Sequence, residues 1–148
     1  MTMNRVRFGL LAIFAFGLAI QMAAFLAVSG KMWPEDLQSL IVKLLGLYAA
    51  PLGVILGGMF AQPKGPLAEP PAALGGAALF LAVLWNLLLA WRSLSFSFAT
   101  QDSATDVIKY MESVSGASTF LVAGMLAFFF AKPPVKDTTP AKSDSTEK

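Results

Sequence analysis

The sequence predicts an all-α integral membrane protein with four transmembrane helices, and three observations lead to this prediction. Long apolar stretches occupy most of the 148 residues, at 8–28, 40–61, 72–91 and 117–131. Apolar residues make up 56% of the chain and charged residues 14%, whereas a soluble domain carries roughly 25% charged residues. A helix needs ~20 largely apolar residues to cross a bilayer, so the first three stretches are long enough.

The first span, at 8–28, follows the basic residues Arg5 and Arg7. A cleaved signal peptide is the alternative, since small residues, Ala23 and Ala24, lie near the end of this run. The run is longer than the ~7–15 apolar residues of an ordinary signal peptide. We therefore expect an uncleaved first helix.

The second span, at 40–61, has start signals upstream of its apolar core. Pro34 suits the first turn of a helix, and the carboxylates of Glu35 and Asp36 suit the positive end of the helix dipole. Pro51 lacks the N–H that an interior helical position needs. The sequence therefore predicts a second helix that begins near Pro34 and bends in its middle.

The third span, at 72–91, lies between two connecting segments. The segment 62–71 is short and rich in proline, which predicts a stiff turn. The segment 93–101 alternates phenylalanine with serine and predicts a surface or re-entrant piece. On this interpretation the two loops on the far side are 29–38 and 93–115.

The fourth apolar stretch, at 117–131, is only ~22 Å long and too short to span alone. Ser103 and Asp106 have the spacing of a capping box, and an apolar face follows at Val107, Ile108, Met111 and Val114. We therefore expect a helix from near Ser103 with its span at about 107–131. Lys132, Pro133 and Pro134 are expected to end it.

The chain divides into a four-helix transmembrane domain at 1–131 and a polar tail at 132–148, which we expect to be disordered and cytoplasmic. A shift of 70 residues aligns Asp36 with Asp106, Gly46 with Gly116, and Phe60 with Phe130. This pattern favours two tandem helical hairpins. Chance alignment of apolar helices is the alternative.

Basic residues predict the orientation of the spans. With a cytoplasmic N-terminus, seven of the 11 Lys and Arg residues lie inside, as the positive-inside rule favours. We therefore predict two cytoplasmic termini in a bacterial plasma (inner) membrane. Trp33, Trp91 and Tyr110 would then share the outer interface, where aromatic residues are enriched.

The residues that carry most catalytic and metal chemistry are missing. The sequence has no cysteine and no histidine, which excludes thiolate or imidazole ligands, disulfides and Cys–His or Ser–His nucleophiles. We therefore expect no enzymatic activity, no cofactor and no metal. The net charge of +2 comes from a few lysines at the membrane edges, so no nucleic-acid partner is expected.

Small residues recur every fourth position in three helices and predict helix-packing seams. Lipid provides no hydrophobic reason for helices to associate, and small residues let two backbones approach closely. Whether these seams pack inside one bundle or against another chain stays open. The seam residues are Ala15, Ala19 and Ala23, then Ala49, Gly53 and Gly57, then Ala123 and Ala127.

Polar residues inside the spans are the best candidates for a functional site, because burying them in hydrocarbon is costly. Gln21, Tyr48 and Asn86 fall at similar depth in the outer half of the bilayer, counted from the outer ends of their spans. Lys43 lies one turn into the second helix and can snorkel to the surface or lean over this group. The layer is either interhelical hydrogen-bond glue or part of a pathway.

Two functions remain open. In the first, the protein acts without catalysis through helix–helix contacts, as an accessory or scaffold subunit or as a homo-oligomer, with the lipid bilayer, other membrane subunits or itself as partners. In the second, it is a small channel or transporter whose pathway passes the polar layer. Three small-residue seams and few intramembrane ionisable residues favour the first.

Overall fold

The computed structural model describes residues 2–60, 71–98 and 103–130. In these ranges the chain is helical, without a strand, which confirms the all-α prediction. The elements in chain order are α1 (Met3–Ala27), the 3₁₀ turn η1 (Ser29–Lys31), α2 (Pro34–Phe60), α3 (Ala72–Phe98) and α4 (Ala104–Phe130). The predicted turn at 62–71, the tail at 132–148 and the stop signal at 132–134 lie largely or wholly outside the described residues.

The helices have the length and composition that a bilayer requires. Three segments in the described ranges are long and apolar enough to cross a membrane: Met3–Lys31, Pro34–Phe60 and Ala72–Phe98. Helix α4 adds a fourth if its two parts, Ala104–Ser118 and Phe120–Phe130, form one bent span. Many large apolar side chains point away from the bundle, including Phe16, Phe80 and Phe120, as expected where lipid covers the outside.

The start of α4 matches the sequence prediction, but the end of α3 does not. The Oγ atom of Ser103 accepts a hydrogen bond from the Asp106 N–H at 3.2 Å and donates one to Oδ2 of Asp106 at 2.7 Å, so the predicted cap forms. The predicted surface or re-entrant piece at 93–101 is wrong at its start, because α3 continues to Phe98. Serines lower the hydropathy of this segment without preventing helix formation.

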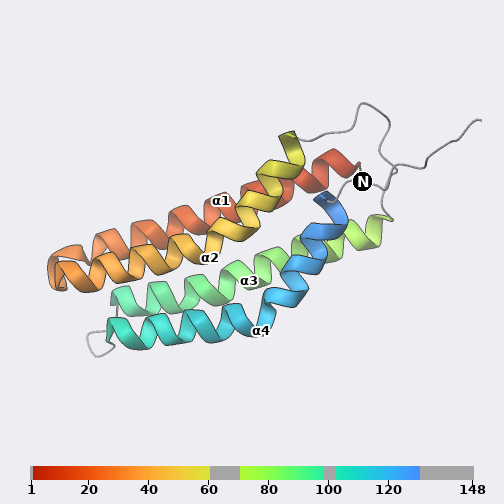
Figure 1. Cartoon of the computed structure of the whole chain (residues 1–148). Helices are drawn as coiled ribbons and strands as arrows, with labels where there is room; N and C mark the ends of the chain where they lie inside the picture. The colour runs from red at the N-terminus through yellow and green to blue at the C-terminus, as the bar shows by residue number, and fades with distance from the viewer. Residues whose placement is uncertain (1, 61–70, 99–102, 131–148) are drawn as a thin grey trace, which may run out of the picture.

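Both second helices of the hairpins change direction. Figure 1 shows α2 bending in its second half, as Pro51 predicts. Helix α4 bends by 55° between Ala104–Ser118 and Phe120–Phe130, and no proline marks this place. The Ser118 hydroxyl donates to the Val114 carbonyl at 2.5 Å, and serine bonds of this kind favour bending of a helix.

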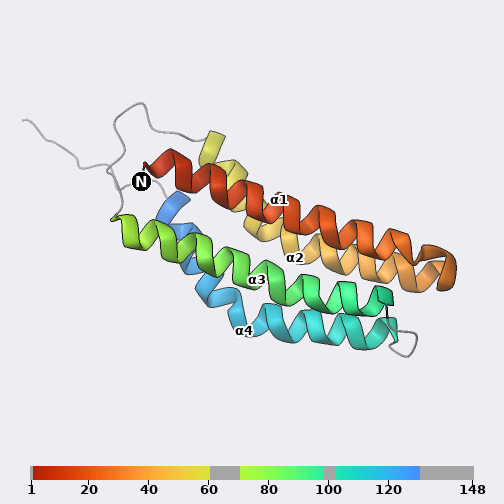
Figure 2. The ribbon, with the colours of Figure 1, turned by 180° about the vertical axis from the view of Figure 1, so that it is seen from behind.

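The helices form two hairpins, α1–α2 and α3–α4, that lie side by side (Figures 1 and 2). Helix α1 packs against α3 and α2, and α4 packs against α2 and α3. The bounds of α2 and α4 differ by 70 at both ends, from 34 to 104 and from 60 to 130. The layout of helices therefore repeats with the offset found in the sequence.

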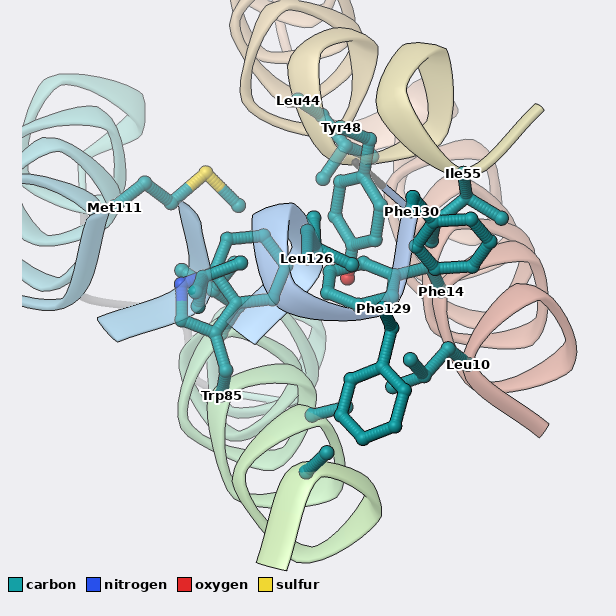
Figure 3. Close-up of a cluster of buried hydrophobic side chains, with 14 of the residues drawn as sticks. Leu10, Phe14, Leu44, Tyr48, Ile55, Trp85, Met111, Leu126, Phe129 and Phe130 are labelled. Atoms are coloured by element: carbon teal, nitrogen blue, oxygen red, sulfur yellow. The ribbon is translucent and has the colours of Figure 1, made fainter. Parts of the chain in front are cut away.

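All four helices contribute to one core, and Figure 3 shows their side chains converging. Phe14 of α1, Tyr48 of α2 and Trp85 of α3 pack against one another with ring centroids 5.2–6.3 Å apart. Met111 and Leu126 add the side chains of α4. Tyr48 belongs both to this aromatic cluster and to the predicted polar layer, so the two lie next to each other.

Candidate functional site

Gln21, Tyr48 and Asn86, predicted to share one depth, form a connected hydrogen-bond network across α1, α2 and α3. The Nε2 atom of Gln21 donates to the Tyr48 hydroxyl at 2.6 Å, and that hydroxyl donates to Oδ1 of Asn86 at 2.6 Å. Gln21 and Tyr48 are 0% exposed and Asn86 is 7% exposed. The Tyr48 hydroxyl therefore joins three helices in a dry interior.

The remaining polar atoms of the network find partners nearby. Nε2 of Gln21 also lies 3.3 Å from the Gly17 carbonyl, and Nδ2 of Asn86 donates to the Ala82 carbonyl at 2.8 Å. The hydroxyl of Ser93 donates to Oε1 of Gln21 at 3.2 Å. Burying polar groups is affordable only when they are bonded in this way.

Ser93 was not among the predicted site residues. Its hydroxyl is 0% exposed and also lies 3.1 Å from the Leu89 carbonyl one turn earlier. We had placed Ser93 in a loop, because Arg92 and the serines after it lower the local hydropathy. The signal that could have found it is spacing: Ser93 follows Asn86 by seven residues, which places both on one helix face.

Gly17 allows the network to form, and the sequence analysis missed it as well. A Cβ atom at this position would lie 1.8 Å from Oδ1 of Asn86 and 3.0 Å from the Tyr48 hydroxyl. The first distance leaves no room for a Cβ atom unless Asn86 moves, and the second is a tight contact. Helix α1 therefore approaches α3 through Gly17, on a different face from the seam predicted at Ala15, Ala19 and Ala23.

Lys43 does not lean over the polar layer. Its Nζ atom lies 2.5 Å from Oε1 of Glu112, and the two side chains are 35% and 51% exposed. The pair links α2 to α4. A pathway through the polar layer would use the positive charge of Lys43. That charge is paired with Glu112 outside the layer.

The predicted seams lie on exposed faces of the chain. Ala15, Ala19 and Ala23 of α1 are exposed, and so are Ala49, Gly53 and Gly57 of α2. A Cβ atom built at Gly53 or Gly57 would meet nothing within 4 Å. The first of the two alternatives was that these residues pack inside one bundle. The described part of the chain does not show such packing for the seams of α1 and α2.

The third seam borders a hollow between α2 and α4. Ala123 and Ala127 line a cavity of about 270 Å³ together with Gly46, Ala50 and Trp85. Ala123 and Ala127 are themselves exposed, so the cavity opens toward the outside. These two alanines therefore face a space beside α2 and make no close backbone contact across it.

Arg7, which the sequence analysis used only to predict the orientation of the spans, also connects α1 to α4. Its Nε atom donates to the Phe129 carbonyl at 2.8 Å, and its guanidinium lies 5.3 Å from the centre of the Phe130 ring. The last carbonyls of a helix lack partners within the helix, and a cation there complements the dipole. Arg7 therefore anchors the end of α4 to α1.

The described residues offer no other centre of chemistry. They contain no group of three or more His, Cys, Asp or Glu side chains that could hold a metal ion. Two cavities beside α2 and α4 do not include Gln21, Tyr48 or Asn86 among their lining residues. The donors and acceptors of Gln21, Tyr48 and Asn86 bind one another. The polar layer can therefore hold three helices in register.

The comparisons with known proteins add no relative: no family model, curated protein or solved structure matches this chain.

Proposed function

We propose that this protein is a non-enzymatic membrane subunit that acts by lateral helix contact, through the face of α2 formed by Ala49, Gly53 and Gly57. This surface is called the α2 face below. The open space at Gly53 and Gly57 is the observation that carries the proposal. Small side chains at four-residue spacing fit the close approach of a second backbone, and none of the helices in the described part of the chain takes that place at Gly53 or Gly57.

The polar layer supports this proposal against a channel or transporter. A pathway needs polar groups that face water or a passing solute. Gln21 and Tyr48 are 0% exposed and bonded to each other, so their polar atoms serve the bundle. Lys43 is paired with Glu112 and does not present its charge to the layer.

Single-cysteine crosslinking tests the α2 face, since the chain has no cysteine to remove. Gly57→Cys places a thiol on the α2 face, and Gly76→Cys places one on the exposed side of α3, where a Cβ atom also meets nothing within 4 Å. Oxidation in native membranes should give a crosslinked product from Gly57→Cys. Gly76→Cys is the matched control and should stay monomeric.

The mass of the product identifies the partner. Twice the mass of the chain indicates a homo-oligomer, and any other mass indicates a different membrane subunit that carries a cysteine. Because a disulfide needs a thiol on both sides, a photo-crosslinking residue at position 57, which needs no cysteine on the partner, completes the test. Equal crosslinking from positions 57 and 76 would mean random collision, and no product from position 57 with either chemistry would mean that the α2 face meets lipid. Either result contradicts the proposal.

We also propose the orientation with both termini cytoplasmic in a bacterial plasma membrane. Trp33 and Trp91 are 78% and 70% exposed, as side chains at a membrane interface would be, and Arg5 and Arg7 lie at the opposite end of α1. Alkaline phosphatase fused after Lys148 should be inactive, and a fusion near Gln101 should be active. The reverse pattern would overturn the orientation.

A further inference from the structure

Two cavities along the boundary of α2 and α4 join into one groove. The first, of about 270 Å³, and the second, of about 490 Å³, share Gly46 and Leu47 in their walls. The second cavity also contacts Ser39 and Lys43, near the N-terminal end of α2. The groove therefore runs from a charged mouth into an apolar interior.

The interior of the groove suits a hydrocarbon chain. Its walls include Gly46, Ala50, Ala123 and Ala127, and Trp85 of α3 also lines it. Small side chains widen the space, and apolar walls offer water few hydrogen-bond partners. The cavity opens toward the outside of the bundle, where Ala123 and Ala127 are exposed. Hydrocarbon from the surrounding bilayer is the filling that matches these walls.

We infer that the groove binds one acyl chain of an anionic phospholipid, with the headgroup phosphate at Lys43. The distance along α2 from Lys43 to Val54, the last cavity residue of this helix, is 11 residues, or ~16 Å. One leaflet contributes half of the ~30 Å hydrocarbon core, ~15 Å. A chain whose headgroup rests at Lys43 therefore ends near the middle of the bilayer.

Lys43 offers the contact for an anionic headgroup. Its ammonium has three N–H donors, and its contact with Oε1 of Glu112 leaves donors for a phosphate oxygen. The Lys43 side chain is 35% exposed, so a headgroup can reach it. The groove does not include Ala49, Gly53 or Gly57, but its wall residues Gly46 and Ala50 lie on the same side of α2, so a partner on the α2 face would border the lipid.

Trp85 supplies a reporter inside the groove. It is 5% exposed and points from α3 toward Leu126 of α4 (Figure 3). The other two of the three tryptophans, Trp33 and Trp91, are largely exposed and can be replaced by phenylalanine. In that background, lipid brominated near the middle of one acyl chain quenches the fluorescence of Trp85 when the chain lies in the groove.

The test reconstitutes the 148-residue chain into phosphatidylcholine vesicles that contain brominated phosphatidylglycerol or brominated phosphatidylcholine. The anionic lipid should reach half-quenching at a lower mole fraction than the zwitterionic lipid. Lys43→Gln should remove this difference. Glu112→Gln should increase it toward about fivefold, the ratio that one unpaired lysine supplies near a membrane surface, because the competing carboxylate is gone.

A groove-filling variant and a matched control separate bound from surrounding lipid. Ala123→Phe should lower quenching by both lipids, whereas Gly76→Phe on the exposed side of α3 should leave it unchanged. Equal quenching of Ala123→Phe and the parent would overturn the acyl-chain site. Equal potency of both lipids, unaltered by Lys43→Gln, would overturn the headgroup site. Quenching that appears only when protein is diluted in lipid would show that a second copy fills the groove, which also overturns the inference.

Discussion

Two glycines, Gly17 of α1 and Gly53 of α2, show that small residues serve different contacts on different faces. At Gly17, Oδ1 of Asn86 from α3 occupies the space that a Cβ atom would need. At Gly53 that place is open. Both glycines lie inside apolar helices, and the sequence alone pointed only to the second. The difference separates a contact made within the chain from one that needs another molecule.

The largest effect is expected for Gly17→Ala. The added methyl group would overlap Oδ1 of Asn86 and crowd the Tyr48 hydroxyl, so α1 and α3 must move apart. Overpacking of this kind costs on the order of 1–3 kcal/mol, and loss of the network adds to it. Thermal unfolding in detergent measures the loss.

Gly76→Ala is the matched control for Gly17→Ala, because the new methyl group meets nothing among the described residues and Gly76 lies outside the α2 face. It should leave the thermal stability within about 0.5 kcal/mol of the parent. If Gly17→Ala and Gly76→Ala unfold at the same temperature, the close approach of α1 to α3 at Gly17 is wrong.

Arg7→Met should have the next largest effect, because it removes the hydrogen bond to the Phe129 carbonyl and the contact with the Phe130 ring. Hydrogen bonds to charged groups contribute roughly 1.5–3 kcal/mol. Unfolding temperature and proteolysis near the end of α4 are the measurements. Arg5→Met is the control, since Arg5 is exposed, and an equal loss in both variants would contradict the anchor.

Tyr48→Phe tests the polar layer with the ring packing retained. It leaves Oδ1 of Asn86 without the donor it has in the parent, and we expect a loss of about 1–2 kcal/mol. Tyr110→Phe is the control, since its hydroxyl makes only a 3.4 Å contact with the Leu88 carbonyl. Unchanged stability with lost biological activity in Tyr48→Phe would favour a pathway over a structural layer.

The smallest effect belongs to the Lys43–Glu112 pair. Its side chains are 35% and 51% exposed, and exposed ion pairs contribute roughly 0.2–1 kcal/mol. A double-mutant cycle with Lys43→Gln and Glu112→Gln gives the coupling energy, which should fall as salt is raised. A coupling above ~2 kcal/mol, or one that salt does not alter, would mean that the pair is shielded from solvent.

Sequence patterns predicted the helices and the layer because both follow from simple counting. Apolar length marks the spans, and Gln21, Tyr48 and Asn86 lie at similar distances from the ends of their helices. Ser93 was missed because polarity alone was taken to end α3. The internal role of Gly17 was missed because a lone glycine forms no repeat, and Arg7 because its partner is a backbone carbonyl 122 residues away.

Sequence patterns could not decide which helix contacts the predicted seams. Small residues at four-residue spacing show that a close contact is possible, but they do not identify which helix makes it. The exposed Ala15, Ala19 and Ala23 of α1 and the α2 face have this property alike. Only the three-dimensional packing shows that no neighbour in the chain fills the space at Gly53.

The mass of the purified assembly in mild detergent tests the central claim most directly. Gly53→Leu places a large side chain on the α2 face, and Gly76→Leu places one on the exposed side of α3, where space is equally open. We predict that the parent and Gly76→Leu retain an assembly larger than one chain, and that Gly53→Leu yields folded single chains. A parent that runs as a single chain with no co-purifying subunit, or two variants with the same assembly, would contradict lateral contact through the α2 face.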